Sequence, residues 1–335
     1  MLSNYVKRRE AELASEDELA KATIPMDWGL DTVALEPSTA NPHQQLLNYV
    51  IHHQDRSELY YQPQPTTEYS YSGSHLSFPS NLQTETPENN IVQCQVFETR
   101  TRSRAVILLP HWNAENNRYN GLASLLRAVG ITTLQITLPY HQGRRPPEMS
   151  NADYLLSANL GRTIRSVRQA VLDCRLAIDW LEQRGYQHIG LVGSSLGSAI
   201  GFVLTAHERR IKTAALLLMG SDFADTVWMS DATRHIQAAI RQVLTLAELR
   251  QIWSVISPTA YAAKLRNRPL RVLVVSGRED RVCHPHLTQQ GIDALAGEAV
   301  DYEWKAWSCG HYTLGAFPYK FYLAGQLVRF LRRTL

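Results

Sequence analysis

The chain has 335 residues, enough for one large α/β domain with an extension or for two ordinary domains. Hydrophobic residues make up 44% of the sequence and charged residues 19%, which is typical of a globular protein with a sizeable buried core. The formal net charge is +3, and the densest basic pairs, Arg144-Arg145 and Arg332-Arg333, are too short for a nucleic-acid-binding stripe. We therefore do not expect nucleic acid as a partner.

Membrane insertion and secretion are also not expected. No apolar run approaches the roughly 18 to 20 residues that cross a bilayer, so no transmembrane segment is predicted. The first residues mix both charges and lack the apolar segment of a secretory signal. The four cysteines, Cys94, Cys174, Cys283 and Cys309, lie far apart without metal-ligand spacing, as expected for reduced thiols. The expected location is the cytoplasm.

From about residue 91 the sequence alternates strand patterns with helix patterns, which predicts an α/β fold with a mostly parallel central sheet and helices on both faces. The expected strands cover 91–97, 105–109, 131–138, 189–192, 214–219, 271–275 and 300–304. The clearest helix covers 162–184, where apolar residues recur at steps of three and four until Gly185 ends it. Further helices are expected over 120–129, after Ser195 and near the C-terminus.

Two regions interrupt this alternation. Residues 1–90 are polar and rich in Pro, Ser, Thr, Gln and Asn toward their end, which predicts a partly irregular extension with a short helix near 46–53 and a possible edge strand. The α/β domain would then span 91–335. Within it, residues 221–268 look helical, over 232–244 and 246–255, and predict a small cap insertion. Such a cap would overhang the carboxyl ends of the strands, where open α/β sheets bind ligands.

The motif that carries chemistry is Gly193-Ser194-Ser195-Leu196-Gly197, which matches G-x-S-x-G. The motif alone is weak, because it arises by chance in roughly one chain in ten of this length. Its context strengthens it: a buried strand leads into it and a helix rich in small residues leads out. This strand-turn-helix arrangement places Ser195 on a sharp turn with its hydroxyl above the sheet, and predicts a nucleophile.

A serine nucleophile needs a histidine base and a carboxylate that orients the base. In folds with this elbow they follow in the order nucleophile, acid, histidine. Asp280 comes three residues after Gly277 at a strand end, and His311 follows the last strand in Cys309-Gly310-His311-Tyr312. We predict these two as acid and base. Glu279 is an alternative acid, and Asp222 and Asp225 are weaker ones.

Acyl transfer also needs backbone N–H donors for the developing oxyanion. The N–H of Leu196, directly after the nucleophile, is the first expected donor. The second should come from the loop after strand 105–109, and either Trp112 or Asn113 fits.

Polar residues near the expected strand ends are candidates for substrate contacts. The loop after strand 131–138 is dense in polar and cationic side chains. Its Arg144 or Arg145 is placed to bind a carboxylate or phosphate, or else these arginines pair with a local acid such as Glu148. The predicted substrate-binding residues are His111, Tyr140, His141 and Arg144. His284 and His286 form a His-Pro-His sequence but lack a third ligand at metal-binding spacing, so no metal site is predicted.

Residues 91–335 resemble the α/β-hydrolase superfamily, and within it a poorly characterised bacterial group of α/β-hydrolase-domain proteins. The stretches that carry the resemblance are Leu109–Ala114, Leu138–His141, Ser157–Thr163, Gly193–Ser198 and Cys309–Tyr312. The resemblance implies the fold, a Ser195, Asp280 and His311 triad and an oxyanion hole, but no particular substrate. At Trp112 the chain departs from the His-Gly sequence common at the oxyanion loop.

The expected function is therefore serine-dependent hydrolysis of a small-molecule acyl ester or thioester, as in carboxylesterases, without a metal or organic cofactor. Three alternatives stay open. The chain could be a non-catalytic binding protein with this fold, an acyltransferase that keeps the triad but excludes water, or a peptidase.

Overall fold

The computed structural model describes residues 2–19, 21, 24–35 and 39–335. Within them, one sheet has the strand order β1-β2-β3-β5-β4-β6-β7-β8-β9. The strands are β1 (Ser70–Ser72), β2 (His75–Pro79), β3 (Ile91–Phe97), β4 (Arg104–Leu109), β5 (Thr132–Ile136), β6 (His188–Ser194), β7 (Ile211–Leu217), β8 (Arg271–Gly277) and β9 (Asp301–Trp307). From β5 to β9 neighbouring strands are parallel, whereas β1, β2 and β3 pair antiparallel at one edge. The prediction of a mostly parallel sheet is confirmed.

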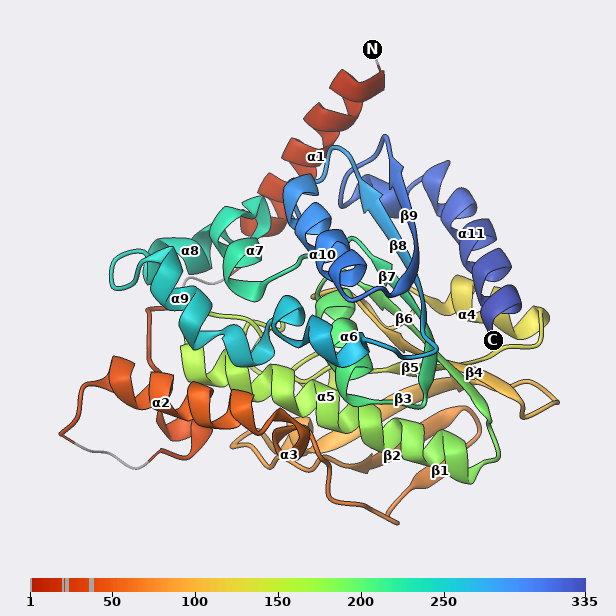
Figure 1. The fold of residues 1–335 in the computed structure, drawn as a ribbon, viewed down its shortest axis with the longest axis horizontal. Coiled ribbons are helices and arrows are strands. Elements are labelled where there is room, and N and C mark those ends of the chain that lie inside the picture. Colours follow the sequence, from red (N-terminus) through yellow and green to blue (C-terminus); the bar gives the residue numbers. More distant parts are fainter. Residues whose placement is uncertain (1, 20, 22–23, 36–38) are drawn as a thin grey trace.

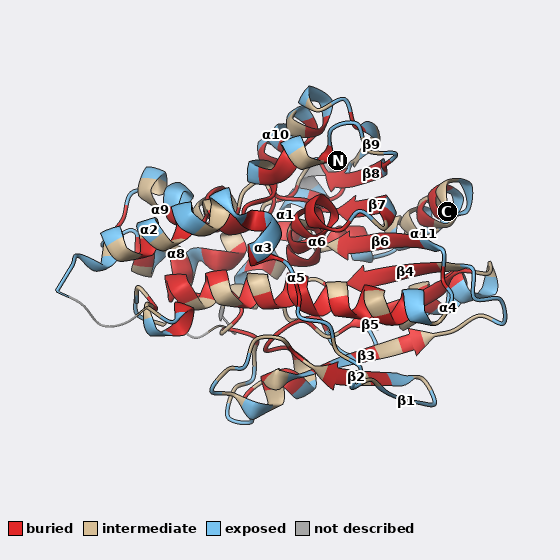
Figure 2. Ribbon diagram, turned by 60° about the horizontal axis from the view of Figure 1, so that its bottom comes forward, coloured by how far each residue is buried: buried red, intermediate tan, exposed pale blue. Residues whose placement is uncertain are grey.

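Alternating side chains of the central strands pack on opposite faces of the sheet. In β4, Val106 and Leu108 join the cluster that contains Leu126 and Phe330, whereas Ile107 joins the larger cluster on the other face. Helices α4 (Asn120–Ala128) and α11 (Tyr319–Thr334) cover the first face. Helices α5 (Leu160–Gln183), α6 (Leu196–His207) and α10 (Pro285–Gly297) cover the second (Figure 1). Because both faces are covered, β4, β6, β7 and β8 are almost entirely buried (Figure 2).

The predicted helical cap lies between β7 and β8. Its described elements are α7 (Phe223–Met229), α8 (Arg234–Ile240), α9 (Leu246–Ile252) and 3-10 segments at Asp231–Thr233, Ser254–Ile256 and Pro258–Leu265. Asp222 caps α7 by accepting hydrogen bonds from the N–H groups of Ala224 and Asp225. Thr245 and Glu248 form a capping box at the start of α9, which explains why a new helix begins there.

The extension before β3 is more ordered than its composition suggests. It contains α1 (Leu2–Leu19), α2 (Pro42–Asp55) and α3 (Ser57–Tyr60), and its residues 70–79 form β1 and β2 at the sheet edge. The helix expected near 46–53 lies inside α2, which Asn41 caps. Helix α1 was not expected, and its place above the ends of the sheet is seen in Figure 1. The domain boundary at residue 90 stays a prediction.

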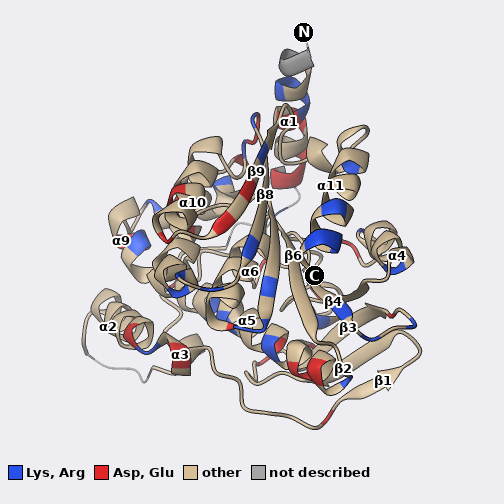
Figure 3. Cartoon of the chain, turned by 45° about the vertical axis from the view of Figure 1, so that its right-hand side comes forward, with Lys and Arg blue, Asp and Glu red and all other residues tan. Residues whose placement is uncertain are grey.

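Two further properties of the described residues are the distribution of charged side chains and the apolarity of the helices. Helix α11 carries Lys320, Arg329, Arg332 and Arg333 but no acidic residue, and Figure 3 shows Lys and Arg elsewhere distributed over many elements. Among the described helices, none is long and apolar enough to cross a bilayer.

Candidate active site

Ser195 occupies the sharp turn between β6 and α6. Its backbone has φ 53° and ψ −120°, a left-handed conformation that is rare for a residue with a side chain. Both flanking glycines are required by packing, because a β-carbon on Gly193 would collide with the Gly197 carbonyl, and one on Gly197 with the Leu109 carbonyl. The turn therefore holds the hydroxyl of Ser195 at the carboxyl edge of the sheet.

Three side chains from distant parts of the chain form a continuous hydrogen-bonded series at this edge. His311 Nε2 lies 2.8 Å from Ser195 Oγ. On the other side of the ring, His311 Nδ1 lies 2.9 Å from Asp280 Oδ2 and 3.1 Å from Oδ1. A carboxylate only accepts, so Nδ1 carries a proton and Nε2 is left to accept from the serine hydroxyl. The geometry suits proton transfer from Ser195 to His311.

Asp280 is the carboxylate that reaches His311. It is 3% exposed, and its Oδ1 accepts 2.8 Å hydrogen bonds from the N–H groups of Val282 and Cys283. The alternatives from the sequence lie elsewhere: Glu279 forms an ion pair with Lys7, Asp222 caps α7, and Asp225 pairs with Arg250.

Nearby carboxylates raise the pKa of His311 more than burial lowers it. Burial of the imidazole lowers its pKa, but the carboxylates of Asp280, Glu10 and Asp17 raise it, and the net result is a pKa above the usual 6.5. Two of these carboxylates come from α1, which sequence patterns did not connect with the site.

The loop after β4 lies beside Ser195, and its contacts distinguish the two candidate oxyanion donors. The Asn113 N–H donates to His141 Nε2 at 3.1 Å, while His141 Nδ1 donates to the Pro139 carbonyl at 2.9 Å. Burial lowers the pKa of His141 to about 4, which keeps the ring neutral for both contacts. Among the described residues, the backbone N–H of Trp112 has no hydrogen-bond partner, whereas its indole N–H donates to the Ala152 carbonyl at 3.1 Å. Leu196 is the first residue of α6, where helical N–H groups lack intrahelical partners.

Of the predicted substrate-binding residues, His111 and His141 each line a cavity, whereas Tyr140 and Arg144 line neither of these two cavities. His111 lines the cavity above Ser195, with Nδ1 2.6 Å from the hydroxyl of Tyr119. His141 is buried against the loop after β4 and lines a second cavity of about 500 Å³. Tyr140 is 3% exposed and packs edge-on against Tyr154, away from both cavities.

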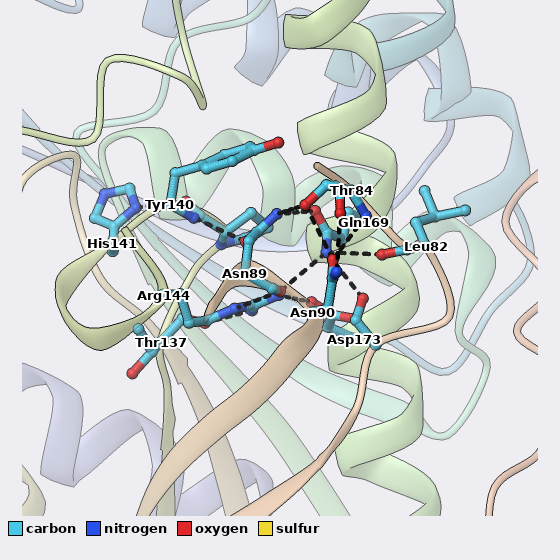
Figure 4. A network of polar contacts seen from close by, with 12 residues as sticks. Leu82, Thr84, Asn89, Asn90, Thr137, Tyr140, His141, Arg144, Gln169 and Asp173 are labelled. Atoms are coloured by element: carbon cyan, nitrogen blue, oxygen red, sulfur yellow. Dashed lines mark hydrogen bonds and ion pairs between the residues drawn. The ribbon is translucent and has the colours of Figure 1, made fainter. Parts of the chain in front are cut away.

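The assignment of Arg144 to substrate binding is wrong. Its side chain is completely buried and forms an ion pair with Asp173 of α5 at 2.8 Å. The guanidinium also donates to the carbonyls of Asn89 and Thr137, within the network shown in Figure 4. Pairing with Glu148, the other interpretation, is not seen either. Through these contacts Arg144 links three segments to one another: the extension, the loop after β5, and helix α5.

The cavity above Ser195 has a volume of about 700 Å³, within the range of small-molecule sites. One part of its lining is an aliphatic wall that comes from α4, α11 and the end of β7. Those wall residues are Leu122, Leu125, Leu217, Leu218, Leu323, Ala324 and Leu327. Arg118, Lys320 and Phe321 also line the cavity, and Lys21 lies 4.3 Å from the ring centroid of Trp112. The aliphatic wall suits an apolar group on the substrate.

The remaining candidates contribute no further site. All four cysteines are free and buried, and burial raises the pKa of both Cys283 and Cys309. His284 Nε2 contacts the carbonyl of Met229, and His286 contacts its sulfur. Within the described ranges, no three His, Cys, Asp or Glu side chains are grouped as metal ligands.

Comparison of the folded chain with solved structures gives clear matches. An acylaminoacyl peptidase from Pyrococcus horikoshii aligns with 80% of this chain at TM-score 0.61 and 11% identity, but only 42% of the peptidase is covered. An acetyl xylan esterase from Paenibacillus sp. R4 aligns with 91% of this chain and 99% of its own at TM-score 0.60 and 16% identity. A puromycin-hydrolyzing peptidase from Mycobacterium tuberculosis aligns with 81% of this chain and 47% of its own, at TM-score 0.59 and 14% identity.

The chain has the α/β-hydrolase fold. It spans less than half the length of the two peptidases and nearly the full length of the esterase. In sequence, no family model and no curated protein matches the chain. At these identities the α/β-hydrolase structures share its architecture, and the assignment of chemistry depends on its own residues.

Proposed function

We propose that this α/β-hydrolase-fold protein is a serine hydrolase that cleaves an ester or thioester bond through an acyl-enzyme. The observation that carries the proposal is the unbroken series Ser195–His311–Asp280, whose serine end opens into a cavity with an aliphatic wall. Such a series is the arrangement by which a serine hydroxyl becomes a nucleophile at neutral pH.

In the proposed reaction Ser195 Oγ attacks the substrate carbonyl while its proton moves to His311 Nε2. Asp280 stabilises the imidazolium that forms, and the backbone N–H groups of Leu196 and Trp112 bind the oxyanion. His311 then protonates the departing alcohol or thiol. A water molecule, deprotonated by His311, attacks the acyl-enzyme and releases the acid. No step requires a metal or an organic cofactor.

The contact between Asn113 and His141 supports Trp112 as the second oxyanion donor. Since the Asn113 N–H is already bonded to a neutral imidazole, it is not available for the oxyanion. The positive φ of 58° at Asn113 turns the backbone there, and the Asn113 side chain accepts a 2.7 Å bond from the Ala152 N–H. These contacts pre-organise the loop, and His141 acts as a positioning residue.

The direct test is labelling of the purified full chain with a fluorophosphonate probe, which reacts with activated serines. We expect one label, on Ser195. A folded wild-type chain that does not react would instead favour a non-catalytic binding protein. Product analysis with and without alcohol acceptors distinguishes the acyltransferase alternative, because only a hydrolase releases mainly free acid. Peptide substrates test the peptidase alternative.

Acyl-chain length should control the rate if the aliphatic wall binds the acyl group. Each added methylene buried there contributes about 0.8 kcal/mol, so kcat/KM for p-nitrophenyl esters is expected to rise about three- to fourfold per methylene until the cavity is filled. Ala324→Phe narrows the cavity and should abolish the gain for long chains while sparing acetate. A rate that falls steadily from acetate onward would contradict this assignment of the wall.

The raised pKa of His311 predicts the pH profile. The base is active only when neutral, so activity is lost as the pH falls through the pKa of the folded enzyme. Because that pKa is raised, the acid limb of kcat/KM should have its midpoint above pH 6.5. The profile is measured with an ester whose leaving group does not titrate in this range. A midpoint well below pH 6.5 would contradict the electrostatic account.

A further inference from the structure

The buried face of α1 has a carboxylate at its centre. Val6, Glu10 and Ala14 follow one another at steps of four residues, so they lie along one side of the helix. Val6 is 3% exposed, Glu10 0% and Ala14 2%. A glutamate is rarely fully buried without partners, because removing its charge from water costs several kcal/mol. The interior face of α1 therefore holds a specific polar contact.

That contact is with the loop that carries His311. Glu10 Oε1 accepts a 2.7 Å hydrogen bond from the Thr313 N–H, and Oε2 accepts a 3.2 Å bond from the Tyr312 N–H. Gly310 makes room for it, because a β-carbon there would overlap the Glu10 side chain. One carboxylate thus binds the two residues that follow His311 and packs on the residue before it.

Helix α1 and Lys21 also reach the other parts of the site. Asp17 Oδ2 accepts a 2.9 Å bond from the Tyr312 hydroxyl, and Lys7 lies 3.5 Å from Glu279 beside the acid. Glu18 accepts bonds from the His235 backbone and ring in the cap. Lys21 donates to the Ala232 carbonyl at 2.8 Å. The helix therefore connects the histidine loop, the acid loop and the cap.

We propose that Glu10 is a positioning residue for His311: it fixes the 310–313 loop so that the imidazole stays in line with Ser195. This inference rests on the proposed function, and it assigns α1 a role in positioning the base. A carboxylate suits the task because its two oxygens satisfy two adjacent N–H donors at once. An amide has only one acceptor atom and would turn an NH₂ group toward the second donor.

Glu10 also contributes charge at the base. The titratable groups that interact with His311 are Asp280 from the acid loop, Glu10 and Asp17 from α1, His111 from the loop after β4, and the neighbouring ring of Tyr312. Burial lowers the pKa of His111 to about 3, so that ring is neutral. Loss of the Glu10 charge should therefore lower the pKa of His311, since one of three supporting carboxylates is removed.

The test compares E10Q with E12Q in the full chain. Glu12 lies on the same helix, where its ion-pair partners among the described residues are the exposed Arg8 and Arg9, so E12Q controls for loss of a glutamate charge from α1. For E10Q we expect kcat to fall about 10- to 100-fold with little change in KM, because the base is misaligned after substrate has bound. The acid limb should also move to lower pH by up to about one unit.

A third variant, E10D, keeps the proposal testable if E10Q does not fold. E10D keeps the charge but is one methylene too short to bind both N–H groups, so kcat should fall while the acid limb stays near its wild-type position. An E10Q enzyme that matches E12Q in kcat or in acid limb overturns the proposal, and so does an E10D enzyme with wild-type kcat. Fluorophosphonate labelling of the wild type is read separately, and its absence would count against the hydrolase function itself.

Discussion

Replacing Ser195 by alanine is expected to lower kcat about a millionfold, because the nucleophile and its base act as one unit. Alanine leaves His311 and Asp280 in place but removes the atom that forms the acyl-enzyme. Among the described residues the hydroxyl of Ser195 contacts one polar side chain, with Oγ 2.8 Å from His311 Nε2, so the fold should tolerate the change. Binding of substrate in the cavity should persist, so KM is less affected than kcat.

The measurement is ester hydrolysis under saturating substrate, with fluorophosphonate labelling as a second readout. Ser124→Ala is a matched control, because Ser124 is an exposed serine on α4 that does not line the cavity. It should retain wild-type rates and labelling. Thermal unfolding of both variants verifies the fold. A Ser195→Ala chain that keeps the rate and the label of the wild type would refute the assigned nucleophile.

Replacing Arg144 by methionine is expected to destabilise the protein by about 3 to 5 kcal/mol, because it leaves a buried carboxylate without its partner. Arg144 and Asp173 are both fully buried, and Arg144 also binds two backbone carbonyls. Burial already raises the pKa of Asp173 despite the guanidinium beside it. Without that guanidinium the carboxyl must take up a proton or remain as an unpaired charge, and either costs free energy.

Urea denaturation measures the free energy of unfolding of the variant. The control is Arg271→Met, which breaks an ion pair with Asp301 whose two side chains are 55% and 56% exposed. That change should cost less than about 1 kcal/mol. A double variant, Arg144→Met with Asp173→Leu, should recover part of the loss because no charge is then left unpaired. Equal effects at Arg144 and Arg271 would show that the buried pair contributes little.

Much of the candidate site could be predicted because its residues follow strand ends. Parallel strands of one sheet direct their carboxyl ends to the same edge, so residues that follow β4, β6, β8 and β9 meet there. Ser195, Asp280 and His311 each follow one of these strands, and His311 lies within hydrogen-bonding distance of both Ser195 and Asp280. Whether they act as a triad stays a prediction until the variants are tested.

Arg144 shows where such reasoning fails. Its loop was correctly placed after β5, but the direction of a long side chain depends on what surrounds it. Asp173 lies in the middle of a helix whose apolar stripe was recognised, and its partner could not be identified from spacing. The same holds for His141, whose two ring nitrogens bind backbone groups of different segments.

The sequence by itself determined the parallel part of the sheet, the helices that cover it and the turn at Ser195, and it proposed the acid and the base, because each depends on local periodicity or on order along the chain. Only the tertiary structure decided that Arg144 is internal and that α1 packs on the His311 loop. It also decided that, among the described residues, the backbone N–H of Trp112 has no partner whereas that of Asn113 has one. Glu10 interrupts the apolar face that would have marked α1 as a packed helix. Its partners lie about three hundred residues away, and contacts over that separation are set by packing, which no local pattern encodes.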